Sequence, residues 1–202
     1  FYAEPTRDGL LKAGLAPGMR VLDLGCGAGD VSFIASGIVG EAGNVTGIDV
    51  SAQAVAIARA RATQGRVRAQ FEQHAIESFD RYGEFDAVIG RFILVHMPDP
   101  AEVLRRLVHA VRSGTLIVSM EMDMSTATAS APFPLMAEQV AHICRMYAGM
   151  VLSPDMGARL FATFRAAGLA PRLAAFTPMG DRTQSAGFDF LVESVRSLLP
   201  AL

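Results

Sequence analysis

The residues best suited to chemistry lie in one glycine-rich stretch, Asp23-Leu24-Gly25-Cys26-Gly27-Ala28-Gly29-Asp30. It follows a short apolar run that predicts a buried strand, and an apolar segment typical of a helix comes after it. Glycine adopts backbone dihedrals closed to other residues and lets a ligand approach the main chain. A helix that begins there directs its free N–H groups toward the turn. The stretch therefore predicts a nucleotide-type pocket.

Two acids in this stretch indicate which ligand the pocket takes. In the dinucleotide fingerprint GxGxxG, the helix N-terminus binds a pyrophosphate. Asp30 stands where the pattern has its last glycine, and its carboxylate would repel a diphosphate. Asp23 adds a second negative charge just before Gly25. Together the acids favour a cationic ligand without phosphate, such as S-adenosylmethionine with its sulfonium and ammonium groups.

The stretch Asp23 to Gly29 resembles the first motif of the class I S-adenosylmethionine-dependent methyltransferases. The similarity is greatest to the small-molecule, ubiquinone/menaquinone-methyltransferase-like group, and it extends over about Gly18 to Met120. The resemblance implies that the methionine part of the donor lies against the acid and the turn. The residues implied are Asp23, Gly25, Cys26, Gly27 and Gly29.

Asp49 ends the second predicted strand, about twenty residues after the glycine turn. A carboxylate there has two acceptor oxygens, which suit the two hydroxyls of a ribose. The alternative is a surface acid at a helix start. Val50, the next residue, is included in the predicted cofactor site. A ribose contact does not distinguish a methyl donor from NAD.

His74 and Ala75 follow the third predicted strand. In the family that this chain resembles, the stretch usually reads Gly-Asp-Ala, and the aspartate accepts a hydrogen bond from the adenine amino group. A neutral imidazole could accept the same hydrogen bond in one tautomer only. In the alternative, backbone amides hold the adenine and His74 faces water, with Ala75 and Ile76 as apolar walls in both cases.

The segment after the fourth strand, Gly90 to Asp99, resembles the part of small-molecule methyltransferases that passes beneath the donor. Because ligands bind at the carboxyl ends of such strands, we expect Arg91 and Phe92 to contact the cofactor. Arg91 has four possible partners: the donor's carboxylate, an acidic substrate, Asp23 or Glu121. His96 is a candidate general base, and a structural role is its alternative.

Apolar runs alternate with helical patterns along the chain, which predicts an α/β fold. We expect a Rossmann-like, doubly wound, mostly parallel sheet with helices on both faces and a helical insertion after strand five. Strands are predicted over 21–24, 45–50, 67–72, 85–90 and 115–120, with a sixth over 172–177. Helices are predicted over 6–14, from 30, 51–63, from 99, 135–150, 155–167 and 188–199. The first helix is expected to place Leu10 and Leu11 on one face.

The length of 202 residues predicts a single methyltransferase domain over 1–202. Its core is expected over about 15–125, and a helical lid over about 131–155. The family's sheet ends with a seventh strand for which no segment qualifies. The turn Arg112 to Thr115 also differs from the family's Pro-Gly-Gly, so we expect that the C-terminal part is incomplete.

Composition limits the partners. The net charge is −2 with acids and bases mixed, which gives no reason to expect nucleic acid or a membrane surface. No apolar run reaches the length of a bilayer span. Cys26 and Cys144 are far apart, and the four histidines have no metal-ligand spacing, so we expect no metal and a reducing, cytoplasmic location. The chain is expected to be a monomer or a homodimer.

These observations predict an S-adenosylmethionine-dependent methyltransferase that methylates an O, N or C nucleophile of a small molecule. The catalytic residue is unknown, because in-line transfer from a sulfonium depends mainly on alignment. One alternative is a non-catalytic methyltransferase-like binding protein. The other is an NAD-dependent oxidoreductase, which both acids disfavour.

Overall fold

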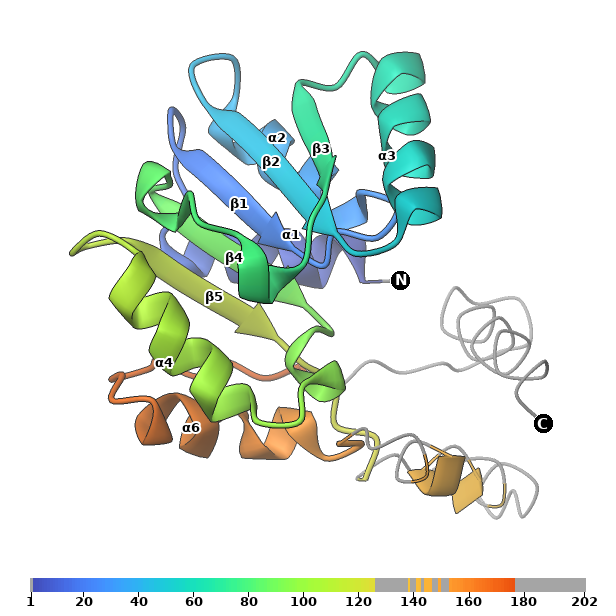
Figure 1. Ribbon diagram of the computed structural model, residues 1–202, viewed down its shortest axis with the longest axis vertical. Helices are drawn as coiled ribbons and strands as arrows, with labels where there is room; N and C mark the ends of the chain where they lie inside the picture. Colours follow the sequence, from blue (N-terminus) through green and yellow to red (C-terminus); the bar gives the residue numbers. More distant parts are fainter. Residues whose placement is uncertain are drawn as a thin grey trace.

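The computed structural model describes residues 2–125, 138, 141, 142, 144–146, 149 and 153–176 (Figure 1). The strands are β1 (Arg20–Leu24), β2 (Asn44–Asp49), β3 (Ala69–Gln73), β4 (Ala87–Arg91) and β5 (Leu116–Met120). The helices are α1 (Ala3–Ala13), α2 (Asp30–Val39), α3 (Ala52–Gly65), α4 (Pro100–Ala110) and α6 (Met156–Ala166). Short 3-10 helices span Ile76–Ser78, Tyr82–Glu84 and Leu94–His96.

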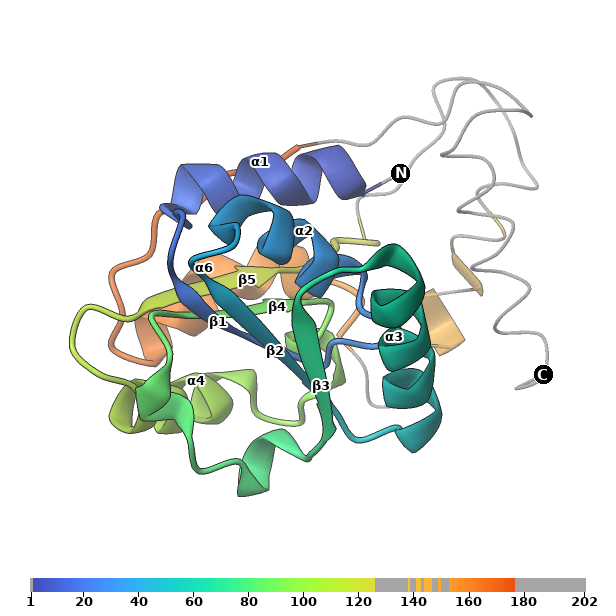
Figure 2. The ribbon, with the colours of Figure 1, turned by 90° about the horizontal axis from the view of Figure 1, so that it is seen from above.

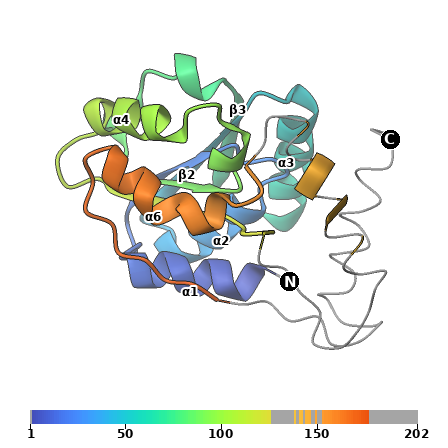
Figure 3. The same ribbon diagram turned by 90° about the horizontal axis from the view of Figure 1, so that it is seen from below.

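The described strands form one parallel five-stranded sheet in the order β3-β2-β1-β4-β5. Helices α1, α2 and α3 cover one face, and α4 with α6 covers the other (Figures 2 and 3). The predicted doubly wound fold is confirmed. The strand order reverses at β1, so the carboxyl ends of β1 and β4 meet at the switch point, where such sheets bind ligands.

Alternate strand residues supply two core layers, as the period of two in a strand requires. Val21, Val45 and Ile89 pack with the layer of α1 and α2, whereas Leu22, Ile48 and Val88 pack with α4 through Leu107. In α1, Leu10 is fully buried, but Leu11 is 46% exposed. The expectation that both leucines share the buried face was wrong, because neighbouring helical residues point about 100° apart.

The predicted helix starts at Ser51 and Asp99 are confirmed by their side-chain caps. The Ser51 hydroxyl accepts the N–H of Ala54 at 3.2 Å, and the Asp99 carboxylate accepts the N–H of Glu102 at 2.9 Å. Helix α3 ends at Gly65, two residues beyond the predicted end at residue 63. The left-handed residue that ends the helix is however Arg66, with φ of 50°.

The predicted sixth strand is corrected for its described part, residues 172–176, which have no strand conformation. The segment follows α1 (Figures 2 and 3) instead of pairing with β5. Arg172 donates to the carbonyls of Lys12 and Ala13 at 3.4 and 3.3 Å, so it satisfies the otherwise free C-terminal carbonyls of α1. Thr177 and the predicted helix 188–199 lie outside the described residues, as does most of the predicted helix Leu135 to Met150.

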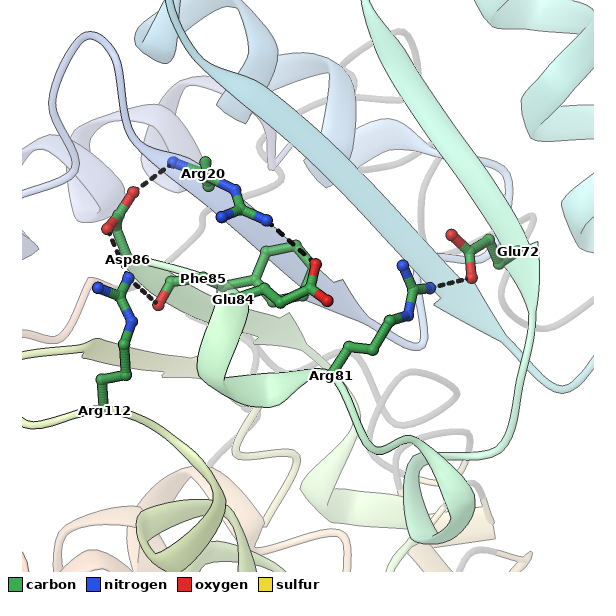
Figure 4. Close-up of polar contacts among 7 residues, drawn as sticks. All are labelled: Arg20, Glu72, Arg81, Glu84, Phe85, Asp86 and Arg112. Carbon is green, nitrogen blue, oxygen red and sulfur yellow. Dashed lines mark hydrogen bonds and ion pairs between the residues drawn. The ribbon is translucent and has the colours of Figure 1, made fainter.

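A polar cluster joins the amino ends of β1, β4 and β5 (Figure 4). Asp86 accepts the backbone N–H of Arg20 at 2.8 Å and the guanidinium of Arg112 at 2.9 Å. Arg112 also donates to the carbonyl of Phe85 at 3.2 Å. The unusual turn before β5 therefore has a local role, because Arg112 anchors the start of that strand.

We expect Asp86→Asn to lower the free energy of unfolding by about 1 kcal/mol at neutral pH, because Arg20 and Arg112 bond to different carboxylate oxygens and the NH2 group that replaces one of them cannot accept a hydrogen bond. The Arg20 N–H, together with Arg112, holds the pKa of Asp86 below its usual range. The contribution is thus present above the unfolded pKa of about 4 and disappears as the pH falls through the folded pKa. Urea denaturation measures it, with the exposed Asp80→Asn as a control expected to change stability by less than about 0.5 kcal/mol. Equal losses in both variants would contradict the assignment.

Candidate functional site

The glycine turn after β1 depends on left-handed backbone at three positions. Gly25, Gly27 and Gly29 have φ of 60°, 53° and 91°. A Cβ at Gly27 would meet no atom within 4 Å, so this part of the turn faces open space. Gly29 is the N-cap of α2. The turn thus offers accessible backbone beside a helix N-terminus, as the sequence predicts.

Cys26 lies inside the turn and is 7% exposed. Its N–H donates to the carbonyl of Ile48 at 2.9 Å, which ties the turn to β2. Burial raises the pKa of the thiol to about 12, so the side chain is neutral. It packs against Gly47, where a Cβ would approach the Cys26 Cβ to 2.8 Å. Cys26 therefore contributes packing and backbone to the site and no thiolate.

Asp49 is fixed between two turns. One carboxylate oxygen accepts the N–H of Gly27 at 2.9 Å, and the other accepts the N–H of Ser51 at 2.8 Å. Each oxygen keeps a further lone pair. The carboxylate is partly exposed beside the glycine turn. Its geometry suits a ligand with two neighbouring hydroxyls.

Asp23 lies beneath the turn and is 1% exposed. Its carboxylate accepts the hydroxyl of Ser32 at 2.6 Å, in the first turn of α2. Burial raises the pKa of Asp23 to about 7, although Ser32 and, more weakly, the charge of Arg91 oppose the shift. Asp23 thus holds the start of α2, and its contact with a ligand stays a prediction.

Asp30 is exposed and forms an ion pair with Arg61 at 2.8 Å. Arg61 also donates to the carbonyl of Ala28 at 2.7 Å. The charge of Asp30 is therefore compensated by a residue of α3. Because Arg61 compensates Asp30, the electrostatic argument against a diphosphate loses one of the two charges on which it rests. The sequence alone does not show that Arg61 is the partner of Asp30.

An open depression lies beside Asp49. Its lining residues are Val50, Gln73, His74, Ala75 and Ser78. Val50, which follows the last residue of β2, is 65% exposed, so its apolar side chain is accessible to a ligand. Gln73 and Ser78 were not predicted from the sequence. Ser78 lies four residues after His74 in the sequence, and its hydroxyl oxygen lies 3.4 Å from Nδ1 of His74.

The His74 ring has a defined environment. Its Nδ1 lies 3.1 Å from the carbonyl oxygen of Ala75, and the backbone N–H of His74 donates to the carbonyl of Asp49 at 3.0 Å. A ring nitrogen beside a carbonyl carries the proton, so in the neutral ring Nε2 is the acceptor. This is the tautomer that an adenine amino group requires.

The segment after β4 packs on the glycine turn. Phe92 has φ of 60°, a strained conformation for a residue with a side chain, and its ring meets Tyr2 edge-on at 5.3 Å. Ile93 covers Gly25 so closely that a Cβ there would lie 1.9 Å from Ile93 Cδ1. Sequence reasoning missed Ile93, because nothing local marks this contact.

Glu121 holds this segment in place from the end of β5. Its Oε1 accepts the N–H groups of Ile93 and Leu94 at 3.1 and 2.8 Å. Its Oε2 is buried and has no hydrogen-bond partner among the described residues. Burial raises the pKa of Glu121. Glu121 therefore positions the backbone that lies over the turn.

His96 ends the 3-10 helix Leu94–His96 and is exposed. Partial desolvation lowers the pKa of its imidazole, which favours the neutral ring at pH 7. A neutral imidazole can accept a proton, so the base role stays a prediction. In the described part of the chain, no group of three or more His, Cys, Asp or Glu side chains is placed to hold a metal. None of the described helices has the length and apolar character to cross a bilayer.

A parallel sheet with a glycine turn at its switch point and an acid at the end of β2 defines an α/β protein of the nucleotide-binding class. Residues 15–168 match the family model of the methyltransferase domain, which is more than half of the chain. The chain belongs to this family. The family that the sequence motifs indicated is confirmed.

Among curated relatives, the chain is 36% identical over 108 residues to a ubiquinone biosynthesis O-methyltransferase of Aeromonas salmonicida, covering 51% of this chain and 43% of that protein. The Serratia proteamaculans enzyme of the same name is 35% identical over 119 residues, covering 58% and 48%. The chain thus spans about half the length of these relatives.

Solved structures show the same fold. The YcgJ protein from Bacillus subtilis is 21% identical with a TM-score of 0.62, covering 83% of this chain and 69% of that one. The [4+2]-cyclase SpnF is 25% identical with a TM-score of 0.53, covering 72% and 56%.

Proposed function

We propose that the chain binds S-adenosylmethionine and that the protein transfers its methyl group to an O, N or C nucleophile of a small molecule. Membership of the methyltransferase domain family and similarity to O-methyltransferases support this proposal. The observation that carries it is the carboxylate of Asp49, which Gly27 and Ser51 fix at the carboxyl end of β2, beside the glycine turn.

The residues of the site fit the parts of this donor, which supplies a methyl group on a positively charged sulfur. Asp49 has free lone pairs for the ribose hydroxyls. The depression beside it offers an exposed apolar side chain and an imidazole acceptor for adenine. The residues proposed for adenine are Val50, His74 and Ala75, and those for the methionine part are Asp23, Gly25, Cys26, Gly27, Gly29, Arg91 and Phe92.

In this proposal, the protein promotes the reaction mainly by holding the methyl donor and the acceptor nucleophile in line. Holding two reactants in line contributes on the order of 7–11 kcal/mol to lowering a barrier. Glu121 and Ile93 serve this purpose, because they fix the segment after β4 against the glycine turn. His96, neutral at pH 7, is the candidate base for an acceptor that must lose a proton.

The proposal includes the domain organisation of residues 1–202. Residues 1–202 form one methyltransferase domain in this proposal, with its core over about 15–125 and a lid over about 131–155 that excludes water from the substrate. It works in the cytoplasm, as a monomer or homodimer, on a small molecule.

One observation favours testing a second candidate. Arg61 compensates Asp30, so the diphosphate of a nicotinamide cofactor would meet less repulsion than the sequence suggests. An NAD-dependent oxidoreductase is therefore the competing function. The chain is also 25% identical to a protein that is named as a cyclase. A methyltransferase-like protein that does not transfer a methyl group is therefore a third candidate.

Calorimetric titration with S-adenosylhomocysteine and with NADH tests these candidates. We expect micromolar binding of S-adenosylhomocysteine, and we expect Asp49→Ala to weaken it by more than about 1.4 kcal/mol, or tenfold. The physical reason is the loss of the acceptor for the ribose hydroxyls. Glu41→Ala, which removes an exposed acid between α2 and β2, is the matched control and should bind as the wild type does.

Asp49 also supports the turn through its hydrogen bonds to Gly27 and Ser51, so a loss of binding must be separated from unfolding. Asp49→Asn, which keeps the size of the side chain, serves as a second variant. The thermal midpoint of each variant shows whether it remains folded. Tight NADH binding without S-adenosylhomocysteine binding would contradict the proposal. Binding of S-adenosylhomocysteine without turnover of any acceptor would leave a donor-binding protein that is not a methyltransferase.

A further inference from the structure

Arg91 ends β4 at the switch point and is partly buried. Its guanidinium donates to the Thr6 hydroxyl of α1 at 2.9 Å and lies 5.5 Å from the centre of the Phe92 ring. It forms no ion pair with any residue that the structure describes. A guanidinium has five N–H donors and stays charged, so the one neutral hydroxyl leaves most of these donors without a hydrogen bond to the described residues.

The acids near Arg91 have other partners. Glu121 lies on the opposite face of the sheet, because Arg91 pairs with Met120 and the next residue points the other way. Glu121 moreover binds the backbone of Ile93 and Leu94. Asp23 is bonded to Ser32, and it interacts with Arg91 only as a nearby charge. Neither protein partner that the sequence suggested therefore forms an ion pair with Arg91.

The place of Arg91 favours a ligand as the missing anion. β4 pairs with β1 up to Leu24 and Gly90, so Arg91 lies next to the residue that opens the glycine turn. Thr6 is 2% exposed, which makes it a fixed anchor for the guanidinium. A partly desolvated guanidinium binds a carboxylate through two parallel hydrogen bonds.

We propose that Arg91 binds a carboxylate that a ligand brings into the site. The carboxylate belongs to the amino-acid part of the methyl donor or to an acidic methyl acceptor. This inference rests on the proposed function and adds to it the residue that selects a negatively charged group. Thr6 is a positioning residue for that contact.

Two variants separate the charge from the anchor. Arg91→Gln removes the charge but keeps an N–H donor for Thr6, whereas Thr6→Val removes the anchor and keeps the charge. The donor arm titrates S-adenosylhomocysteine against its decarboxylated analogue, which retains the ammonium and lacks only the carboxylate. The acceptor arm titrates 3,4-dihydroxybenzoate against catechol, with S-adenosylhomocysteine present.

We expect Arg91→Gln to weaken binding of the carboxylate-bearing member of one pair about tenfold or more, and binding of the member that lacks the carboxylate less than about twofold. The pair that responds identifies the source of the carboxylate. Thr6→Val should reduce the same preference by a smaller factor. A purely structural role would lower the affinity for both members of a pair equally, so the ratio within a pair is the decisive measurement.

Equal effects within both pairs, or no effect in either, would overturn the role of Arg91 while leaving the proposed function intact. If the wild type binds neither adenosine compound, the proposed function fails and this inference fails with it. Thermal midpoints of both variants confirm that the fold is retained.

Discussion

Gly25→Ala is expected to lower the free energy of unfolding by about 3 kcal/mol. A side chain at φ of 60° costs roughly 1–2 kcal/mol, because Cβ crowds the backbone. The new methyl group would also lie 1.9 Å from Ile93 Cδ1, and overpacking of this kind costs about 1–3 kcal/mol. Urea denaturation at neutral pH measures the loss.

Gly27→Ala is the matched control. Gly27 has a similar φ of 53°, but a Cβ there meets no atom within 4 Å. The control should lose only the conformational part, about 1 kcal/mol. Adding Ile93→Ala to Gly25→Ala should return part of the lost stability, and the double-mutant cycle measures this coupling. Equal losses at both glycines, without coupling to Ile93, would show that the contact is unimportant.

The sheet and the helix starts could be predicted because their signals are local. Short apolar runs, or for β3 an alternation of apolar and polar residues, marked the five described strands, and Ser51 and Asp99 cap the helices that follow β2 and β4. Asp49 could be placed because parallel strands bring their carboxyl ends to one edge. These inferences need only the order of elements along the chain.

The features that sequence reasoning missed depend on contacts between distant residues. Arg61 compensates Asp30 from another helix, 31 positions away. Arg172 reaches the end of α1 across 160 positions, which draws its segment away from the sheet edge. Ile93 covers Gly25 only because the strand order makes β1 and β4 neighbours. None of these partners has a pattern in its own neighbourhood.

The contacts of Arg91 illustrate the same limit inside the site. The sequence places it at a strand end with several acids within reach. Only the register of β4 and β5 assigns Arg91 and Glu121 to opposite faces. Strand pairing, which is a property of the folded sheet, therefore excludes Glu121 from the possible partners of Arg91 that the residue types had left open.

The pH dependence of stability should reveal Asp23. Burial raises the pKa of Asp23 to about 7, above the value of about 3.9 in an unfolded chain. Between these values the folded state holds a proton that the unfolded state has lost. The contribution is complete below about pH 4 and is lost as the pH rises through about 7, by up to about 4 kcal/mol.

Asp23→Asn cannot titrate, so the difference in unfolding free energy between wild type and variant isolates this group. We expect the difference to shift against the wild type between about pH 4 and about pH 7 and to be constant above. Asp30→Asn, in the same turn but exposed, should keep the wild-type profile. A difference that does not change with pH would contradict the burial of an ionisable Asp23.

Ser32→Ala gives the sign of the effect a second test. The Ser32 hydroxyl bonds the Asp23 carboxylate at 2.6 Å and opposes the rise of its pKa. Without this donor, the charged form loses its main stabilising contact, so the pKa of Asp23 should rise further. The loss of stability should then extend to higher pH than in the wild type. A shift to lower pH would mean that Ser32 and Asp23 do not interact as a buried pair, and Asp23 would no longer explain how the glycine turn is joined to α2.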